Sequence, residues 1–220
     1  MKNLQDKDTQ RIHFQAPAFM DLTSRIPSKP QEVILLLHGL GERGKRIYRK
    51  FVSSLPENAA ILAPNGIYPL PSVRNGETRY TYAWYFYDRA SQSYLINQDL
   101  PVAWLGEMIR SLDLDHLPLT IIGFSQGGYL APFVGQSLPQ TKHVIGIGCE
   151  FRTPLLKDHF DFKMTAIHGT EDKIILPEWA EKEVKELKAR GVASEFHLVP
   201  GVGHEINSEI VKQILNVIRK

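Results

Sequence analysis

The chain has a single cysteine, Cys149, among its 220 residues. One cysteine excludes an internal disulfide, and cysteine-poor chains are typical of reducing compartments. The sequence also lacks any apolar run long enough to cross a bilayer, and its polar residues 1–11 lack the apolar core of a signal peptide. We therefore expect a soluble, cytoplasmic protein without a transmembrane segment.

A surplus of charge of one sign is missing as well. The 26 Lys and Arg residues nearly balance the 24 Asp and Glu residues, for a net charge of +2. The basic residues are scattered rather than gathered in a stripe, which argues against a nucleic-acid partner. No Cys/His cluster or His-x-x-x-His pair indicates a metal site, so we expect no metal and no cofactor. The oligomeric state is not determined by the sequence, and a homodimer is left open.

What the chain does contain is a series of short apolar runs that alternate with helix-like segments. A hydrophobic content of 43% suits one globular domain over residues 1–220. The alternation predicts an α/β fold, a mostly parallel, doubly wound sheet with helices on both faces. Segments 12–20 and 22–26 suggest an edge hairpin, and residues 1–10 are expected to fray. Buried strands are expected at 33–37, 59–63, 119–124, 143–148, 162–168 and 194–199.

Residues 66–97 depart from this alternation. Pro69, Pro71 and Asn75-Gly76 indicate turns, and six aromatic residues then follow between positions 80 and 87. A long irregular connection in a compact domain is usually a functional loop. We predict a lid or pocket loop here, and the alternative that these rings fill the rim of the core stays open.

The most informative motif is Gly-x-Ser-x-Gly at Gly123, Ser125 and Gly127, between an apolar run and a helix-like run. This context is typical of a nucleophile elbow, whose sharp turn needs glycine on both sides because side chains would clash there. The serine hydroxyl then lies at a helix N-terminus, where backbone N–H groups favour developing negative charge. We predict that Ser125 is a nucleophile. Because the bare motif also occurs by chance, the rest of the chain must supply its partners.

A serine hydroxyl needs a base to accept its proton, and the chain has eight histidines. His204 lies in a glycine-rich loop after the last expected strand, at the sheet edge where open α/β sheets place their sites. It is also the last member of the order Ser…Asp…His that this elbow usually shows. His38 and His168 each end a strand just before glycine, but neither occupies the base position of this fold. We predict that His204 is the base.

An acid is expected after a strand between the serine and the histidine. Asp172 fits, and it would hold the imidazole in the required tautomer; Glu150 and Glu171 are the competing residues. An oxyanion hole needs two backbone donors, one after the nucleophile and one after an early strand. Gln126 and Leu40 fill these places, and losing one such donor typically costs ~3 kcal/mol.

The loop Gly39–Gly44 offers a competing interpretation. It spells G-x-G-x-x-G after a strand, and with Lys45 it nearly spells the phosphate-binding G-x-x-x-x-G-K. Arg46 stands where that second motif requires Ser or Thr, and the next strand ends in Pro64-Asn65 without an acidic ribose partner. A nucleotide-binding protein is therefore the alternative that this loop supports.

Four segments together resemble a known family. Residues 38–41 (HGLG), 123–128 (GFSQGG), 168–172 (HGTED) and 203–206 (GHEI) resemble the phospholipase/carboxylesterase family of α/β hydrolases. That family includes acyl-protein thioesterases and small bacterial carboxylesterases, and the similarity extends from about residue 33 to the C-terminus. The resemblance implies a single-domain α/β-hydrolase fold and a set of site residues. These are the triad Ser125, Asp172 and His204, the oxyanion donors Leu40 and Gln126, and Trp84 at the border of the acyl site.

Two departures concern the substrate rather than the chemistry. Glu42-Arg43-Gly44 stands where the family often has Asp-containing loops, and the Asp expected soon after Trp84 is displaced to Asp88. The sequence thus predicts a carboxylesterase-type serine hydrolase that cleaves small acyl esters or thioesters through an acyl-enzyme on Ser125. A non-catalytic ligand-binding homologue is the further alternative, because a fold does not fix an activity.

Overall fold

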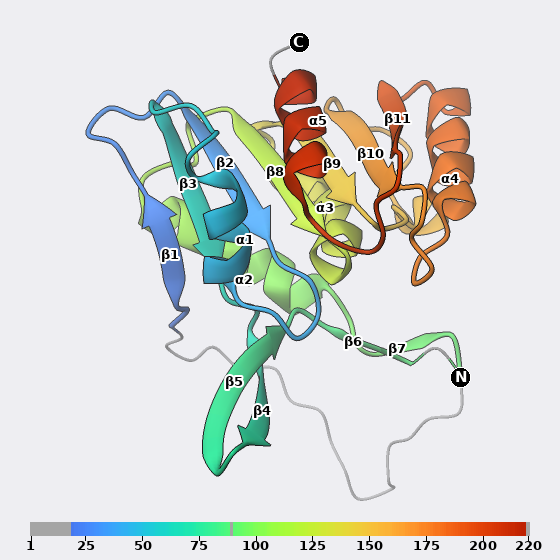
Figure 1. Cartoon of the computed structure of the whole chain (residues 1–220). Coiled ribbons are helices and arrows are strands. Elements are labelled where there is room, and N and C mark those ends of the chain that lie inside the picture. The colour runs from blue at the N-terminus through green and yellow to red at the C-terminus, as the bar shows by residue number, and fades with distance from the viewer. Residues whose placement is uncertain (1–18, 89, 219–220) are drawn as a thin grey trace, which may run out of the picture.

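A computed structural model describes residues 19–88 and 90–218, and its centre is a seven-stranded sheet (Figure 1). The strand order is β1-β3-β2-β8-β9-β10-β11, in which only β1 runs antiparallel to its neighbour. The predicted α/β fold with a mostly parallel sheet is therefore confirmed. The strands are β1 (Leu22–Arg25), β2 (Glu32–Leu37), β3 (Ala59–Pro64), β8 (Leu119–Phe124), β9 (Thr141–Ile147), β10 (Lys163–Gly169) and β11 (Ser194–Val199).

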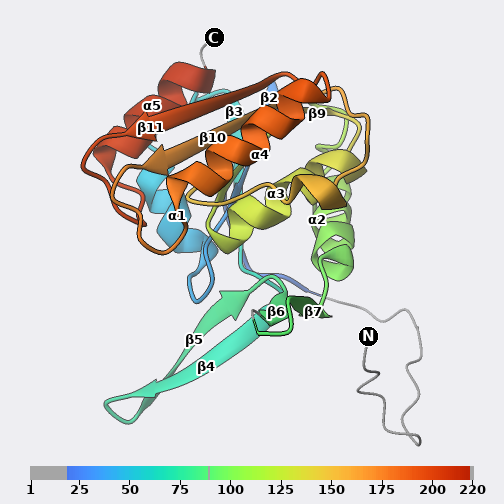
Figure 2. The same cartoon turned by 90° about the vertical axis from the view of Figure 1, so that its right-hand side faces the viewer.

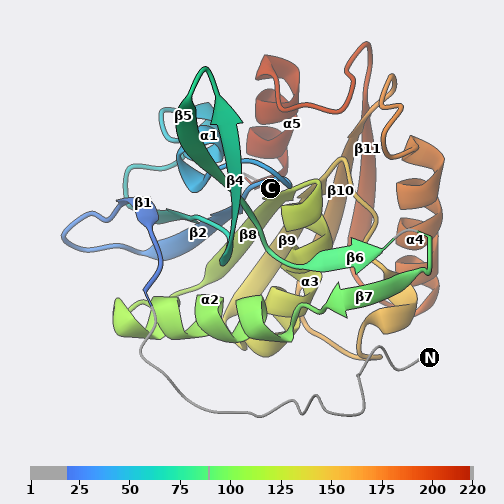
Figure 3. The same cartoon turned by 90° about the horizontal axis from the view of Figure 1, so that it is seen from below.

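Helices cover both faces of this sheet (Figure 3). Residues of β2 alternate between the two faces. Leu35 and Leu37 pack on the side of α2, α3 and α4, whereas Ile34 and Leu36 pack on the side of α1 and α5. Burial on both faces explains why the strand is a continuous apolar run. The helices are α1 (Gly44–Phe51), α2 (Asp99–Ser111), α3 (Gln126–Ser137), α4 (Pro177–Ala189) and α5 (Ser208–Ile218).

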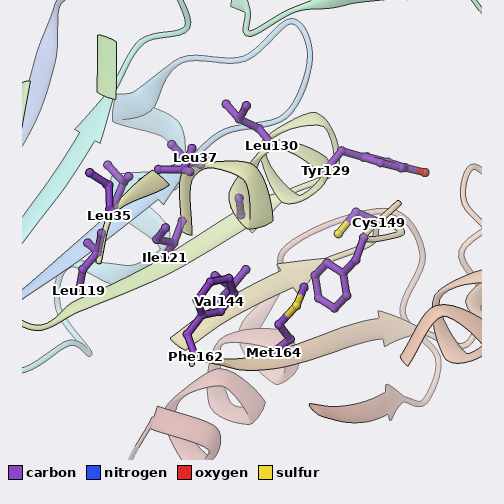
Figure 4. Close-up of a cluster of buried hydrophobic side chains, with 14 of the residues drawn as sticks. Leu35, Leu37, Leu119, Ile121, Tyr129, Leu130, Val144, Cys149, Phe162 and Met164 are labelled. Atoms are coloured by element: carbon purple, nitrogen blue, oxygen red, sulfur yellow. The ribbon is translucent and has the colours of Figure 1, made fainter. Parts of the chain in front are cut away.

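The larger apolar cluster lies between the sheet and α3 (Figure 4). Leu37, Ile121 and Leu130 are fully buried in it, and Tyr129 reaches from its edge with the hydroxyl turned away from the cluster. Cores of this kind are packed as densely as organic crystals. This packing therefore holds the backbone at the start of α3 in a fixed position.

Residues 66–97 form two β-hairpins, so the predicted irregular connection is wrong. Strand β4 (Tyr68–Arg74) pairs with β5 (Glu77–Ala83), and β6 (Phe86–Asp88) pairs with β7 (Ser93–Ile96). The first hairpin extends away from the sheet (Figures 1 and 2). Its turn is Asn75-Gly76, with φ of 52° and 76°, the pair that two-residue hairpin turns prefer.

The edge hairpin predicted near the N-terminus can be compared with the structure only in part. Strand β1 is an edge strand that pairs with β3 rather than within a local hairpin of its own among the described residues. Most of segment 12–20, the expected partner, and the expected frayed residues 1–10 lie outside the described part of the chain. Within the described residues, no helix combines the length and the apolar character needed to cross a membrane.

The end of β2 is held by His38, a buried side chain whose two ring nitrogens both have partners. Its Nδ1–H donates to the Gly39 carbonyl at 2.7 Å, and the Gly66 N–H donates to its Nε2 at 2.8 Å. Burial of the ring lowers the pKa of His38 to about 4, from an ordinary value of 6.5. The neutral form satisfies both hydrogen bonds, whereas protonation at Nε2 would break the one from Gly66.

We expect acid to weaken the fold through His38. Its folded pKa lies below the unfolded value, so the unfolded chain binds the extra proton between these values. The stabilisation is complete above pH about 6.5 and is lost as the pH falls toward 4, by about 3 kcal/mol. Urea unfolding at pH 7.0, 5.5 and 4.5 should show a smaller decline for His38→Gln than for the wild type. Equal declines in the two proteins would contradict this assignment.

Candidate active site

The expected sharp turn lies between β8 and α3, with Ser125 at its apex. Ser125 has φ of 48° and ψ of −117°, a backbone conformation that a non-glycine residue rarely adopts. The glycines on either side permit the close approach of neighbouring backbone. A Cβ on Gly123 would lie 2.3 Å from the Gly127 carbonyl oxygen, and one on Gly127 would lie 2.3 Å from that of Leu37. The turn therefore exposes the serine hydroxyl at the start of α3.

The position of this turn follows from the strand order. Strands β2 and β8 are parallel neighbours, and the chain proceeds from β2 to β3 on one side of the pair while β9 lies on the other. Open α/β sheets bind ligands outside the carboxyl ends of strands at such a reversal. The loop that begins at His38 follows one of these strand ends and the turn at Ser125 follows the other, so the loop and the turn lie side by side.

A continuous hydrogen-bonded series joins three distant side chains. His204 Nε2 lies 3.0 Å from Ser125 Oγ, and His204 Nδ1 lies 2.8 Å from Asp172 Oδ2. These partners assign the tautomer in which Nδ1–H donates to the carboxylate and Nε2 accepts from the hydroxyl. The imidazole also packs on Phe124, with ring centroids 5.0 Å apart. The serine is thus paired with an imidazole that a buried carboxylate orients.

Asp172 is placed by the loop after β10. Its Oδ1 accepts the backbone N–H groups of Ile174 at 2.9 Å and Ile175 at 3.0 Å. Burial by itself raises the pKa of this carboxyl, but the bonds from Ile175, His204 and Ile174 outweigh burial and lower the pKa of Asp172. The carboxylate therefore stays ionised while it accepts from His204. The competing Glu171 is exposed to solvent.

His168 also contacts this carboxylate, a role that was not predicted from the sequence. Its Nε2–H donates to the Ile175 carbonyl at 2.9 Å and lies 3.3 Å from Asp172 Oδ2. Burial lowers the pKa of His168, so the ring is neutral beside the carboxylate. Its position at the end of β10, directly before Gly169, was the available signal, because strand ends meet at this edge of the sheet.

Gly148 leaves space for the side chains of His204 and Asp172. It follows β9 with φ of 55°, and a Cβ there would lie 3.2 Å from His204 Nδ1 and 3.3 Å from Asp172 Oδ2. Both the backbone conformation and the close contact favour glycine. The end of β9 therefore shapes the space in which His204 and Asp172 meet.

The two backbone N–H groups expected to form the oxyanion hole lie just after the carboxyl ends of the neighbouring strands β2 and β8. Leu40 and Gln126 line the same cavity as Ser125, and in the described part of the chain neither backbone N–H donates to a protein acceptor. The loop that carries Leu40 is held to β5 by Gly41 N–H, which donates to the Tyr82 carbonyl at 3.0 Å. Both amides are thus held in place and available to an oxygen near Ser125 Oγ.

Trp84 does not border the cavity, contrary to what the resemblance implied. Its side chain is completely buried, and its Nε1–H donates to the His38 carbonyl at 2.9 Å. Its backbone N–H donates to Gln126 Oε1 at 2.9 Å, and Gln126 Nε2 donates to the Tyr85 carbonyl at 2.9 Å. Trp84 therefore braces the end of β2 and Gln126 from behind, while its neighbour Tyr85 lines the cavity.

A cavity of about 480 Å³ opens beside Ser125, and several of its residues carry polar groups that the sequence did not single out. Tyr129 projects from α3, and its hydroxyl donates to Glu150 Oε1 at 2.9 Å. Glu150 is thus tied to Tyr129 rather than to a histidine. The lining residues are Leu40, Tyr85, Phe86, Tyr87, Gln92, Tyr94, Ser125, Gln126, Tyr129, Glu150, Arg152, Ile174, Ile175 and Trp179. In the sequence, the only indications of this cavity were the aromatic residues of the 66–97 segment and the strand end at Ile147.

The Gly39–Gly44 loop is poorly suited to phosphate. The Gly39 N–H donates to the Glu42 carboxylate at 3.1 Å, and the Gly44 N–H donates to Asn65 Oδ1 at 2.9 Å. A phosphate needs several free N–H groups and no carboxylate among them. The structure therefore weakens the nucleotide-binding alternative.

One group of possible metal ligands occurs among the described residues. Asp113, Asp115 and His116 bring their ligand atoms within 4.8 Å of one another, and all three are exposed. They precede β8, at the opposite end of that strand from Ser125. The candidate site at Ser125 therefore has no share in this group.

Comparisons with known proteins agree with this geometry. A model of the phospholipase/carboxylesterase family matches residues 25–220. Carboxylesterase SOBER1 of Arabidopsis thaliana is 27% identical over 207 residues, which cover 85% of this chain and 89% of that protein. Acyl-protein thioesterase 1 homolog 2 of Dictyostelium discoideum is 29% identical over 112 residues, 46% of this chain and 49% of that protein.

Solved structures show the same fold. Acyl-protein thioesterase 2 of Zea mays superposes with a TM-score of 0.74 at 18% identity, over 91% of this chain and 98% of that one. The family match over most of the chain and the curated relatives indicate hydrolysis of ester or thioester bonds. This chain belongs to the phospholipase/carboxylesterase family of α/β hydrolases.

Proposed function

We propose that the chain is a serine esterase that acts through an acyl-enzyme on Ser125. The observation that carries the proposal is the Ser125–His204–Asp172 series, with contacts of 3.0 and 2.8 Å at an elbow that lines the cavity. Hydrogen-bonding distances of this kind let a base accept the nucleophile's proton without rearrangement. The substrate is a small acyl ester or thioester, and Ser125, His204 and Asp172 form the catalytic triad.

In the acylation step, Ser125 Oγ attacks the carbonyl carbon as its proton passes to His204 Nε2. Asp172 holds the ring in the correct tautomer and stabilises the imidazolium that forms. The oxygen of the tetrahedral intermediate becomes negative and accepts the backbone N–H groups of Leu40 and Gln126. As the C–O or C–S bond breaks, His204 returns the proton to the leaving alcohol or thiol.

In the second step, water replaces the leaving group. The water oxygen attacks the acyl carbon while His204 accepts a proton from that water. His204 then gives the proton to Ser125 Oγ as the carboxylic acid product leaves. The start of α3 contributes to both steps, because the N-terminal end of a helix favours nearby negative charge. Over the two steps, one water molecule is consumed and Ser125 and His204 return to their starting protonation states.

A fluorophosphonate probe tests the proposal directly. Such probes phosphonylate an activated serine and expel fluoride, so mass spectrometry should find the adduct on the peptide that contains Ser125. Ser125→Ala should prevent labelling, whereas Ser137→Ala, a serine at the far end of the same helix, should label like the wild type. An unlabelled wild-type protein, or equal labelling of Ser125→Ala, would overturn the proposal.

A further inference from the structure

Arg152 occupies an unusual place in the wall of the Ser125 cavity. It follows the carboxyl end of β9 and has a left-handed backbone, with φ of 55° and ψ of 47°. Its guanidinium carbon lies 4.9 Å from the centre of the Tyr87 ring and 5.4 Å from the centre of the Tyr129 ring. Contacts between a cation and aromatic faces hold the guanidinium in one orientation. Arg152 is therefore a positioned side chain of the cavity wall rather than a free surface arginine.

The guanidinium has no hydrogen-bond acceptor in the described part of the chain. Its Nε is buried without a partner. The nearby Glu150 is held instead by the Tyr129 hydroxyl. A guanidinium carries five N–H donors and is always charged, and leaving such donors unpaired away from water is costly. Arg152 as a whole is half-buried on the cavity wall, so its outer N–H groups are accessible to an acceptor that enters the cavity.

The rest of the cavity wall is mixed, because Leu40, Ile174, Ile175 and Trp179 line it together with tyrosines and Glu150. It carries the rings of Tyr85, Tyr94 and Tyr129, and Gln98 Nε2 fixes the Tyr94 hydroxyl at 2.6 Å. A pocket for a long acyl chain needs a mainly aliphatic lining without an unpaired charge, because burying a charge against hydrocarbon is unfavourable. Tyrosine hydroxyls and a guanidinium fit an oxygen-rich group instead.

We propose that Arg152 is the anion-binding residue of this cavity and that the preferred ester carries a carboxylate on its acyl part, as in a monoester of a dicarboxylic acid. The inference rests on the proposed esterase function of Ser125, because both residues line the same cavity of about 480 Å³. A carboxylate matches the flat fork of a guanidinium and forms two parallel charge-assisted hydrogen bonds with it. The acyl carbon then lies at Ser125 while the far carboxylate reaches Arg152.

Two substrates of equal chain length test the inference. Mono-4-nitrophenyl adipate and 4-nitrophenyl hexanoate differ in the group at the far end of the acyl chain, a carboxylate or a methyl. The measured quantity is the ratio of their kcat/KM values, corrected for spontaneous hydrolysis. We expect the wild type to favour the adipate ester, and Arg152→Gln to lower the ratio by about 10- to 100-fold, the range for a lost charge-assisted pair.

Three further variants separate recognition from folding. Arg152→Lys keeps the charge but lacks the fork, so it should recover part of the preference. Glu150→Gln removes a negative charge from the cavity and should raise the ratio, opposite in sign to Arg152→Gln. Arg110→Gln makes the same change in net charge on the exposed surface of α2 and should leave the ratio unchanged.

The outcomes are distinct. A wild-type protein that hydrolyses both esters, with a ratio that Arg152→Gln does not lower, overturns the inference while the esterase function stands. A ratio lowered equally by Arg110→Gln also overturns it, because the preference would then come from overall charge. Failure of the esterase function has another signature, in which neither ester is hydrolysed and Ser125 takes up no fluorophosphonate. In that case both proposals fall.

Discussion

Replacing Ser125 with alanine is expected to lower kcat for 4-nitrophenyl acetate by about 10⁵-fold or more, because the proposed mechanism forms the acyl-enzyme on this hydroxyl. Within residues 19–88 and 90–218, the partner of the hydroxyl is His204 Nε2 at 3.0 Å. Removing the hydroxyl therefore abolishes nucleophilic attack and leaves the base without a proton to accept. Some acceleration over water should remain, since the amides of Leu40 and Gln126 can still stabilise an oxyanion.

The fold should tolerate this change. Ser125 is half-buried, and alanine meets the same backbone strain at φ of 48° as serine does. Circular dichroism and the midpoint of urea unfolding should therefore match the wild type. Full esterase activity in Ser125→Ala, measured after correction for spontaneous hydrolysis, would show that another residue carries the reaction.

Replacing Asp172 with asparagine should have the second largest effect, about a 10⁴-fold loss of kcat. The Asn Oδ1 can still accept the N–H groups of Ile174 and Ile175, so the loop should keep its shape. The Nδ2 amide in place of Oδ2, however, donates toward His204 Nδ1 and stabilises the tautomer protonated at Nε2. That ring can no longer accept the Ser125 proton.

The neighbouring carboxylate provides the control for this variant. Glu171 was the competing acid in the sequence, and its side chain is exposed. Glu171→Gln should keep wild-type kcat and KM for 4-nitrophenyl acetate, while Asp172→Asn loses kcat with little change in unfolding free energy. The reverse result would move the acid from position 172 to 171, against the hydrogen bond between Asp172 and His204.

Much of the fold was predictable because its signals are local. Strands buried on both faces, such as β2 and β8, are continuous apolar runs, and each ends at a glycine-containing motif. The motifs at Ser125, Asp172 and His204 follow strands whose carboxyl ends must meet at one edge of a parallel sheet. Their convergence was therefore expected before any coordinate was known, and the family resemblance was confirmed.

The failures arose where side-chain environment decides the outcome. Trp84 was placed at the acyl site by its motif, yet burial and its bond to the His38 carbonyl turn it away from the cavity. The two hairpins of residues 66–97 were not predicted, because Pro69 and Pro71 within β4 were interpreted as turn signals although the seven residues of β4 pair with β5. Arg152 gave no sequence signal at all, since nothing local indicates that Tyr87 and Tyr129 would surround it.

The sequence by itself determined the class of fold, the elbow and the chemical identity of the three residues proposed to react, because apolar periodicity and glycine-dependent turns are properties of short segments. Only the tertiary structure decided which side chains face one another. His204 meets a serine 79 positions away and a carboxylate 32 positions away, and among the described residues the guanidinium of Arg152 has no hydrogen-bond acceptor in the cavity beside that serine. Such contacts depend on strand order and packing, and these are set by the whole chain at once.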